Sequence, residues 1–104
     1  MLNLTPHPIT LQFPDGTRAI LPPSGQLARV TTEEVVVGWA SGLPVVSRTF
    51  GQVTGLPEEG TPCIVSALVA GAVPGRAGVF APDSGPTAIR EGGQVVAVTR
   101  LVIA

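Results

Sequence analysis

The chain has 104 residues, the size of one domain, and 44% of them are hydrophobic. That apolar share excludes a disordered chain, and the 13 glycines and 11 prolines, which follow no period, exclude collagen and a coiled coil. Charged residues make up only 12% and the net charge is −1, so the chain lacks the positive field with which proteins bind nucleic acid polymers. We expect a single domain over residues 1–104.

Residue types that are rare or missing exclude several kinds of chemistry. Lysine is absent, which excludes a P-loop lysine and a lysine Schiff base. With one cysteine, Cys63, and one histidine, His7, the chain forms neither an internal disulfide nor a zinc site without a partner. We therefore expect no metal and no cofactor.

No segment has the pattern of a targeting signal or a membrane span. The N-terminus lacks a basic start and reaches Pro6 and Pro8 at once. The longest run without charge, residues 60–75, is interrupted by Pro62 and Pro74 and is too short to cross a bilayer. Nothing demands an oxidising compartment. The expected location is the cytoplasm, that of the host cell if a phage encodes the protein, with no membrane partner.

Valine, threonine and isoleucine dominate the chain, and the first half predicts strands. Residues 9–21 alternate apolar and polar side chains around Pro14-Asp15-Gly16 and predict a hairpin. Two further strands are expected, a short one at 27–31 and another at 34–40.

A long strand is predicted over 44–54, after a turn at Ser41-Gly42. Strand periodicity places Val46, Arg48 and Phe50 on one face. Gly51, in the middle of this segment, predicts a bulge or a close backbone approach.

The second half predicts one helix and a closing strand. Ser66 is a candidate N-cap for a helix over 67–73, which Pro74-Gly75 stops. A hairpin turn at Glu91-Gly92-Gly93 leads into a continuous apolar strand over 94–103. The whole pattern predicts a mainly β fold, a small antiparallel barrel or sandwich with one short helix packed on it.

No catalytic constellation emerges, so we expect a protein that is not an enzyme. Ser66 is explained by its place at a helix start, and His7, between two prolines, is explained as a structural histidine. Glu58-Glu59 reads as a solvated turn, and Cys63 as a small core residue. A hydrolase that uses His7 with an acid is a third option beside the two hypotheses below.

Arginines in apolar settings are the best candidates for a ligand site. An arginine there needs a carboxylate, backbone carbonyls or an external anion for its donors. Seven acids offer internal partners for some of them, and arginine without lysine is also a mark of a G+C-rich genome. The positions concerned are Arg29, Arg48, Arg76, Arg90 and Arg100.

The chain has four aromatic residues. They are expected in the core, although one of them has the chemistry to stack on a base. They are Phe13, Trp39, Phe50 and Phe80.

The opening Asn3-Leu4-Thr5-Pro6-His7-Pro8-Ile9 resembles that of a family of small phage, prophage and actinobacterial proteins. The block Ile64-Val65-Ser66-Ala67-Leu68-Val69-Ala70, leading to Pro74-Gly75-Arg76, resembles the same family. Shorter matches in the same order extend the resemblance over nearly the whole chain. One departure is that Ala77-Gly78 follow Arg76, where the family pattern has an acid.

The resemblance implies a phage context, in which small proteins serve as virion parts, regulators or inhibitors of host immunity. The first hypothesis is a non-enzymatic sponge that sequesters a small phosphorylated nucleotide signal. Arginine forks bind phosphate in two-pronged fashion, and backbone N–H groups at a helix start add donors. The candidate ligand-binding residues are Asn3, His7, Arg29, Trp39, Arg48, Ser66, Arg76 and Arg90.

The second hypothesis is a structural or protein-interaction module of a phage particle. Apolar residues on both faces of several strands, such as Val35-Val36-Val37 and Val45-Val46, need cover that one short helix cannot supply. Under either hypothesis we expect a homo-oligomer, most simply a dimer.

Overall fold

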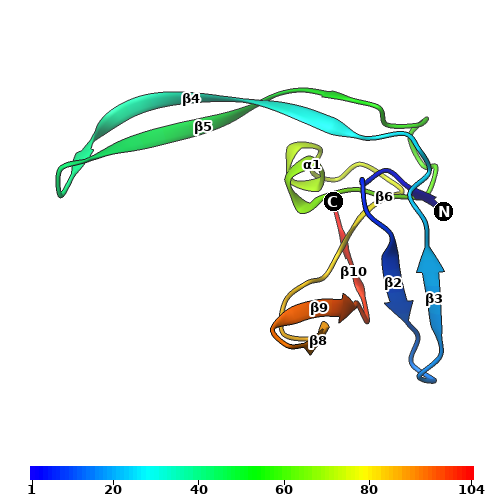
Figure 1. Ribbon diagram of the computed structural model, residues 1–104. Helices are drawn as coiled ribbons and strands as arrows, with labels where there is room; N and C mark the ends of the chain where they lie inside the picture. Colours follow the sequence, from blue (N-terminus) through cyan, green and yellow to red (C-terminus); the bar gives the residue numbers. More distant parts are fainter.

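The computed structural model describes all of residues 1–104, and Figure 1 shows its arrangement. About half of the residues lie in strands, and one short helix accompanies them, which confirms the predicted mainly β class. The strands form a four-stranded sheet and three separate two-stranded hairpins. None of these sheets closes into a barrel, which leaves the sandwich-like arrangement.

The four-stranded sheet has the order β1-β6-β7-β10. Its strands are β1 (Leu2–Asn3), β6 (Cys63–Ile64), β7 (Val79–Pro82) and β10 (Leu101–Ile103). β6 pairs in parallel with β1 and with β7, whereas β10 pairs antiparallel with β7. The sheet is therefore mixed. The parallel pairing of β6 with β7 requires a crossover connection, which contains a helix.

Helix α1 (Ala67–Ala72) makes that crossover. The Ser66 hydroxyl accepts a hydrogen bond from the Val69 backbone N–H at 3.3 Å, so the predicted N-cap is confirmed. Val69 and Ala70 face the sheet and are buried with Leu4 and Cys63. Only 11 of the 104 residues are buried, so this core is small for the length of the chain.

Two short hairpins were predicted and are confirmed. β2 (Ile9–Gln12) pairs with β3 (Arg18–Leu21), and β8 (Ile89–Glu91) pairs with β9 (Gln94–Ala97). Both Gly92 and Gly93 have positive φ, the conformation that a tight turn between β8 and β9 needs.

The predicted continuous strand over 94–103 is wrong, because β9 ends at Ala97 and β10 begins at Leu101. Between them the chain leaves β8 and binds the first hairpin instead. The Gln12 N–H donates to the Val98 carbonyl at 2.8 Å, and the Val98 N–H donates to the Thr10 carbonyl at 2.9 Å. These bonds interrupt the strand between β9 and β10, and they join the β2–β3 hairpin to the rest of the molecule.

The largest feature is a hairpin of two twelve-residue strands, β4 (Arg29–Ala40) and β5 (Leu43–Thr54), which we call the arm. The two strands predicted at 27–31 and 34–40 are therefore one strand, since β5 offers a partner along its whole length. Figure 1 shows the arm extending from the body. It helps to raise the radius of gyration to 16.1 Å, against roughly 13 Å for a compact chain of this size.

Gly51 has both properties that the sequence predicted. The register shifts between Val30 and Thr32, where β5 carries one residue more than β4. A side chain at Gly51 would also place its Cβ only 2.1 Å from the Thr31 Oγ1 atom. Glycine thus permits the bulge through which the arm leaves the core.

Candidate functional site

The arm exposes most of its apolar side chains. Trp39, near the tip, is 72% exposed, and Leu43 is 67% exposed. The expectation that the aromatic residues lie in the core is wrong for Trp39 and Phe50 on the arm and for Phe13 on the body. The exposed large apolar residues of the arm are Val35, Val36, Val37, Trp39, Leu43, Val45, Val46 and Phe50.

Both faces of the arm are apolar. The register confirms that Val46, Arg48 and Phe50 share one face, opposite Val36, Glu34 and Thr32 in that order. An ion pair of 2.7 Å between Arg48 and Glu34 crosses this face. Val35 and Val45 lie on the other face. A hairpin alone is marginally stable in water, and exposed apolar patches are typical of protein interaction surfaces.

The body holds the arm only at its base. Val30 and Val53 pair with each other and pack against the buried core. From there each strand runs on to the tip, where Ser41 and Gly42 both have positive φ, as a two-residue hairpin turn requires. The anchored base fixes where the arm starts, and the outer part is left without cover from the body.

The surface area of the chain measures this lack of cover. The chain exposes 6735 Å². A folded monomer of 10.6 kDa is expected to expose about 5,500 Å². The excess of about 1,200 Å² is larger than the roughly 800 Å² that each partner buries in an interface of standard size.

The candidate arginines do not gather in one place. No cavity of the structure is lined by more than one of them. Arg76 donates to the Pro57 carbonyl at 2.7 Å, and Arg90 donates to the Gly85 carbonyl at 3.0 Å. Arg100 pairs with Asp83, and Arg48 with Glu34. Internal acceptors thus supply partners for four of the five arginines.

Arg29 is the one of these five arginines whose side chain has neither an ion pair nor a hydrogen bond within the chain, and it lines a cavity of about 310 Å³ at the base of the arm. Ser66 lines the same cavity, so the structure brings these two candidate residues together. Leu4, Thr5 and Pro6 of the N-terminal segment form another part of its wall.

Asn3 is a structural residue of that N-terminal segment. Its side chain is buried and donates to the His7 carbonyl at 2.8 Å and to the Leu21 carbonyl at 3.0 Å. Its oxygen accepts from the Thr5 hydroxyl at 2.6 Å and from the Thr5 N–H at 3.0 Å. The side chain of His7 is exposed. The Asn3 amide is therefore fully engaged within the chain.

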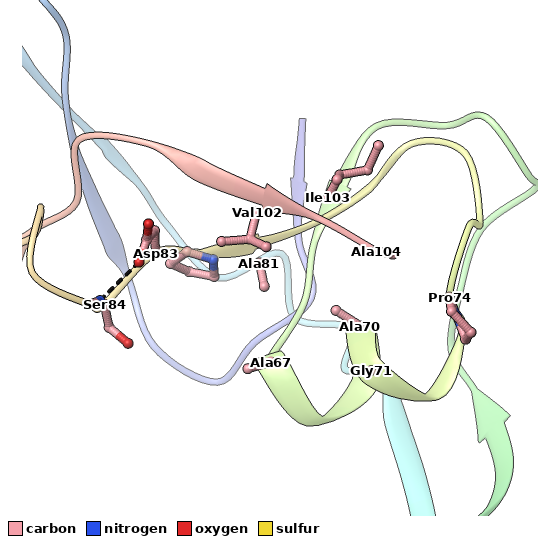
Figure 2. Close-up of a pocket in the computed structure, with 12 residues that line it drawn as sticks. Ala67, Ala70, Gly71, Pro74, Ala81, Asp83, Ser84, Val102, Ile103 and Ala104 are labelled. Atoms are coloured by element: carbon pink, nitrogen blue, oxygen red, sulfur yellow. Dashed lines mark hydrogen bonds between the residues drawn. The ribbon is translucent and has the colours of Figure 1, made fainter.

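The largest cavity, about 410 Å³, lies between α1 and β10, and Figure 2 shows its lining. Ala67, Ala70 and Gly71 form the helical wall, while Val102 and Ile103 form the strand wall. We call it the α1–β10 groove. The sequence did not single it out, because its walls are apolar residues without a motif, from segments about thirty positions apart.

One end of the α1–β10 groove is polar. Asp83, Ser84 and Gly85 lie there, and the Asp83 carboxylate accepts from the Gly85 N–H at 2.9 Å. The Arg100 guanidinium beside Asp83, with this N–H, holds the pKa of the carboxyl below its usual range. The groove thus combines apolar walls with acceptors at one end.

The remaining candidates have structural places. Cys63 is fully buried in the core as predicted, and burial raises the pKa of its thiol. Glu58 and Glu59 lie exposed in a turn. No group of three or more His, Cys, Asp or Glu side chains is placed to hold a metal ion. No helix has the length and apolarity to span a bilayer.

Comparison of the chain with models of known protein families, with curated proteins and with solved structures finds no match. The resemblance to a phage family therefore stays a prediction that rests on the sequence blocks.

Proposed function

We propose that this protein is a structural or protein-interaction module, of the kind that serves in phage particles, and that it assembles through the arm. The observation that carries the proposal is the arm itself: two twelve-residue strands with exposed valines, Trp39 and Phe50 on an anchored base. The excess exposed surface has the size of a protein interface, and no catalytic grouping accompanies it.

Light scattering at low micromolar concentration tests the proposal. The wild-type chain is expected to have a mass at least twice 10.6 kDa. The double variant Val36→Thr and Val46→Thr keeps strand propensity but removes the apolar contact on one face, so it shifts the mass towards the monomer. Ile20→Thr makes the same change on exposed β3 and is the control.

If the purified wild-type chain has a mass near 10.6 kDa at every concentration, self-assembly through the arm is overturned. Retention of the oligomer in the double variant assigns the contact to another surface and overturns the role of the arm.

The nucleotide sponge is the second candidate, and Arg29 is the observation in its favour. Arg29 has no acidic partner and lines the 310 Å³ cavity, where a phosphate would satisfy its donors. Thermal shift with a panel of cyclic and ADP-ribose-derived nucleotides tests it. A nucleotide that binds only the folded chain raises the free energy of unfolding by about 2.7 kcal/mol when its concentration is a hundred times Kd. No shift with any nucleotide, or the same shift in Arg29→Gln, rejects this function.

A further inference from the structure

We propose that the arm tip of one copy inserts Trp39 into the α1–β10 groove of a second copy. This inference rests on the proposed function, because it names the surface that receives the arm. Four observations carry it: the blunted edges of the tip, the chemistry of the groove, the geometry of the arm and the exposed area.

The tip is built for contacts through side chains rather than for strand pairing. Pro44, opposite Trp39, has no N–H to offer a further strand. On the other strand the register shifts between Val36 and Gly38, so Val37 is a bulged residue without a partner. Proline and bulges are the devices that protect strand edges from pairing with each other. The exposed indole of Trp39 is left as the main contact of the tip.

The groove matches the chemistry of that indole. Its walls are apolar, the residues of the helical wall are small, and Ile103 on the strand wall is 76% exposed. Gly71 leaves an opening in the helical wall, since a Cβ at that position would meet no atom within 4 Å. The carboxylate of Asp83 at the polar end is an acceptor for the single N–H of an indole. The groove thus offers an apolar slot and one acceptor to an apolar ring with one donor.

The occupant has to come from another copy. Figure 1 shows that the tip lies at the end of the arm remote from α1, so a chain does not reach its own groove. A twelve-residue strand spans roughly 40 Å, which is enough to reach across a neighbouring body. Reciprocal insertion about a two-fold axis closes the assembly as a dimer, the commonest symmetric form.

The excess exposed area of the chain is also consistent with a second copy as the partner. An excess of about 1,200 Å² per chain supplies more than the roughly 800 Å² per partner of a standard interface. Two copies that exchange arms would cover this excess on both chains at once.

Trp39 is the only tryptophan and tyrosine is absent, so intrinsic fluorescence reports on the tip alone. We expect the emission to move to shorter wavelength, and acrylamide quenching to fall, over the concentration range in which light scattering detects assembly. Gly71→Glu places a charge in the groove and raises helix propensity, so it is expected to weaken assembly about thirtyfold or more while the fold persists.

Leu68→Glu is the matched control, because it puts the same charge on an exposed position of α1 outside the groove. Urea unfolding checks that both variants fold. Supporting outcomes are a shielded Trp39 in the wild type and in Leu68→Glu, and an exposed Trp39 in Gly71→Glu.

Three outcomes overturn the inference. Assembly with a freely quenched Trp39 leaves the proposed function standing but removes the tip from the interface. A shielded Trp39 in Gly71→Glu places it in another pocket. A wild type that stays monomeric with an exposed Trp39 overturns the inference and self-assembly through the arm together.

Discussion

Asp83 and Arg100 join the end of β7 to the segment that leads into β10: the Arg100 Nε atom donates to the Asp83 Oδ2 atom at 2.6 Å. The backbone repeats the connection, since the Asp83 N–H donates to the Arg100 carbonyl at 3.1 Å. Asp83 also accepts from the Gly85 N–H. This pair therefore shapes the polar end of the α1–β10 groove.

The first prediction concerns the titration of Asp83. The Arg100 hydrogen bond, and next the Gly85 N–H, lower the pKa of Asp83. A carboxyl with a lowered pKa in the folded state stabilises the fold above its ordinary pKa of about 3.9, and this contribution is lost as the pH falls through the folded value. A carboxyl NMR titration is expected to place the midpoint below the ordinary value.

Arg100→Gln is expected to move the Asp83 midpoint up towards the ordinary value. Asp15 is the internal control, because its pKa is lowered by the hydroxyl and N–H of Thr17 and not by an arginine. An Asp83 midpoint that does not respond to Arg100→Gln contradicts the prediction.

The second prediction concerns Asn3. Asn3→Asp keeps the shape but replaces the amide that donates to the His7 and Leu21 carbonyls. The carbonyls of His7 and Leu21 then face a buried carboxylate instead of a donor, and the lost hydrogen bonds cost about 1–3 kcal/mol. Urea denaturation at pH 7 measures the loss. Thr5→Ala removes one hydroxyl from the same cluster and is expected to lower the free energy of unfolding by less. Equal stability of Asn3→Asp and the wild type refutes the role given to Asn3.

The third prediction compares two glycines. Gly55 has a φ of +85°, and a Cβ there would lie 2.1 Å from the Leu27 carbonyl oxygen. Gly55→Ala is therefore expected to lower the free energy of unfolding by about 1–3 kcal/mol. Gly71→Ala, in the helix and facing open space, is expected to raise it by about 0.5–1 kcal/mol. Thermal unfolding measures both, and a stable Gly55→Ala is the outcome against this account.

The fourth prediction concerns Cys63. The thiol is fully buried, and its burial raises the pKa against a smaller opposing effect of Arg76. Because the thiolate is the reactive form, a disulfide reagent at pH 8 should label Cys63 only when the core opens. Labelling is expected to be slow in buffer and fast in urea. Val69→Ala, which opens a space in the same core cluster, should speed it; rapid labelling of the native wild type would disprove the burial.

Local sequence signals predicted the elements whose cause is local. The turn at Pro14-Asp15-Gly16, the Ser66 cap and the Gly51 bulge all appear where the residues placed them. In each case the decisive chemistry lies within a few positions: a side-chain oxygen near a backbone N–H, or a missing Cβ where two backbones meet.

The positions of the aromatic residues were not predictable in the same way. Trp39 and Phe50 are apolar, and composition alone places such residues inside a fold. Their exposure follows from the length of the arm, which runs beyond anything the body can cover. The partners of Arg76 and Arg90 are backbone carbonyls, which carry no sequence signal at all.

The sequence by itself determined the mainly β class, the turns, the short capped helix and the presence of more apolar strand surface than one helix can cover. Only the tertiary structure decided that this surface is gathered on one arm, and that Gly71 and Ile103 line one groove. The physical reason is the sequence separation of the residues in contact. Turns and caps depend on neighbours in the chain, whereas the arm and the groove depend on which distant segments the small core brings together.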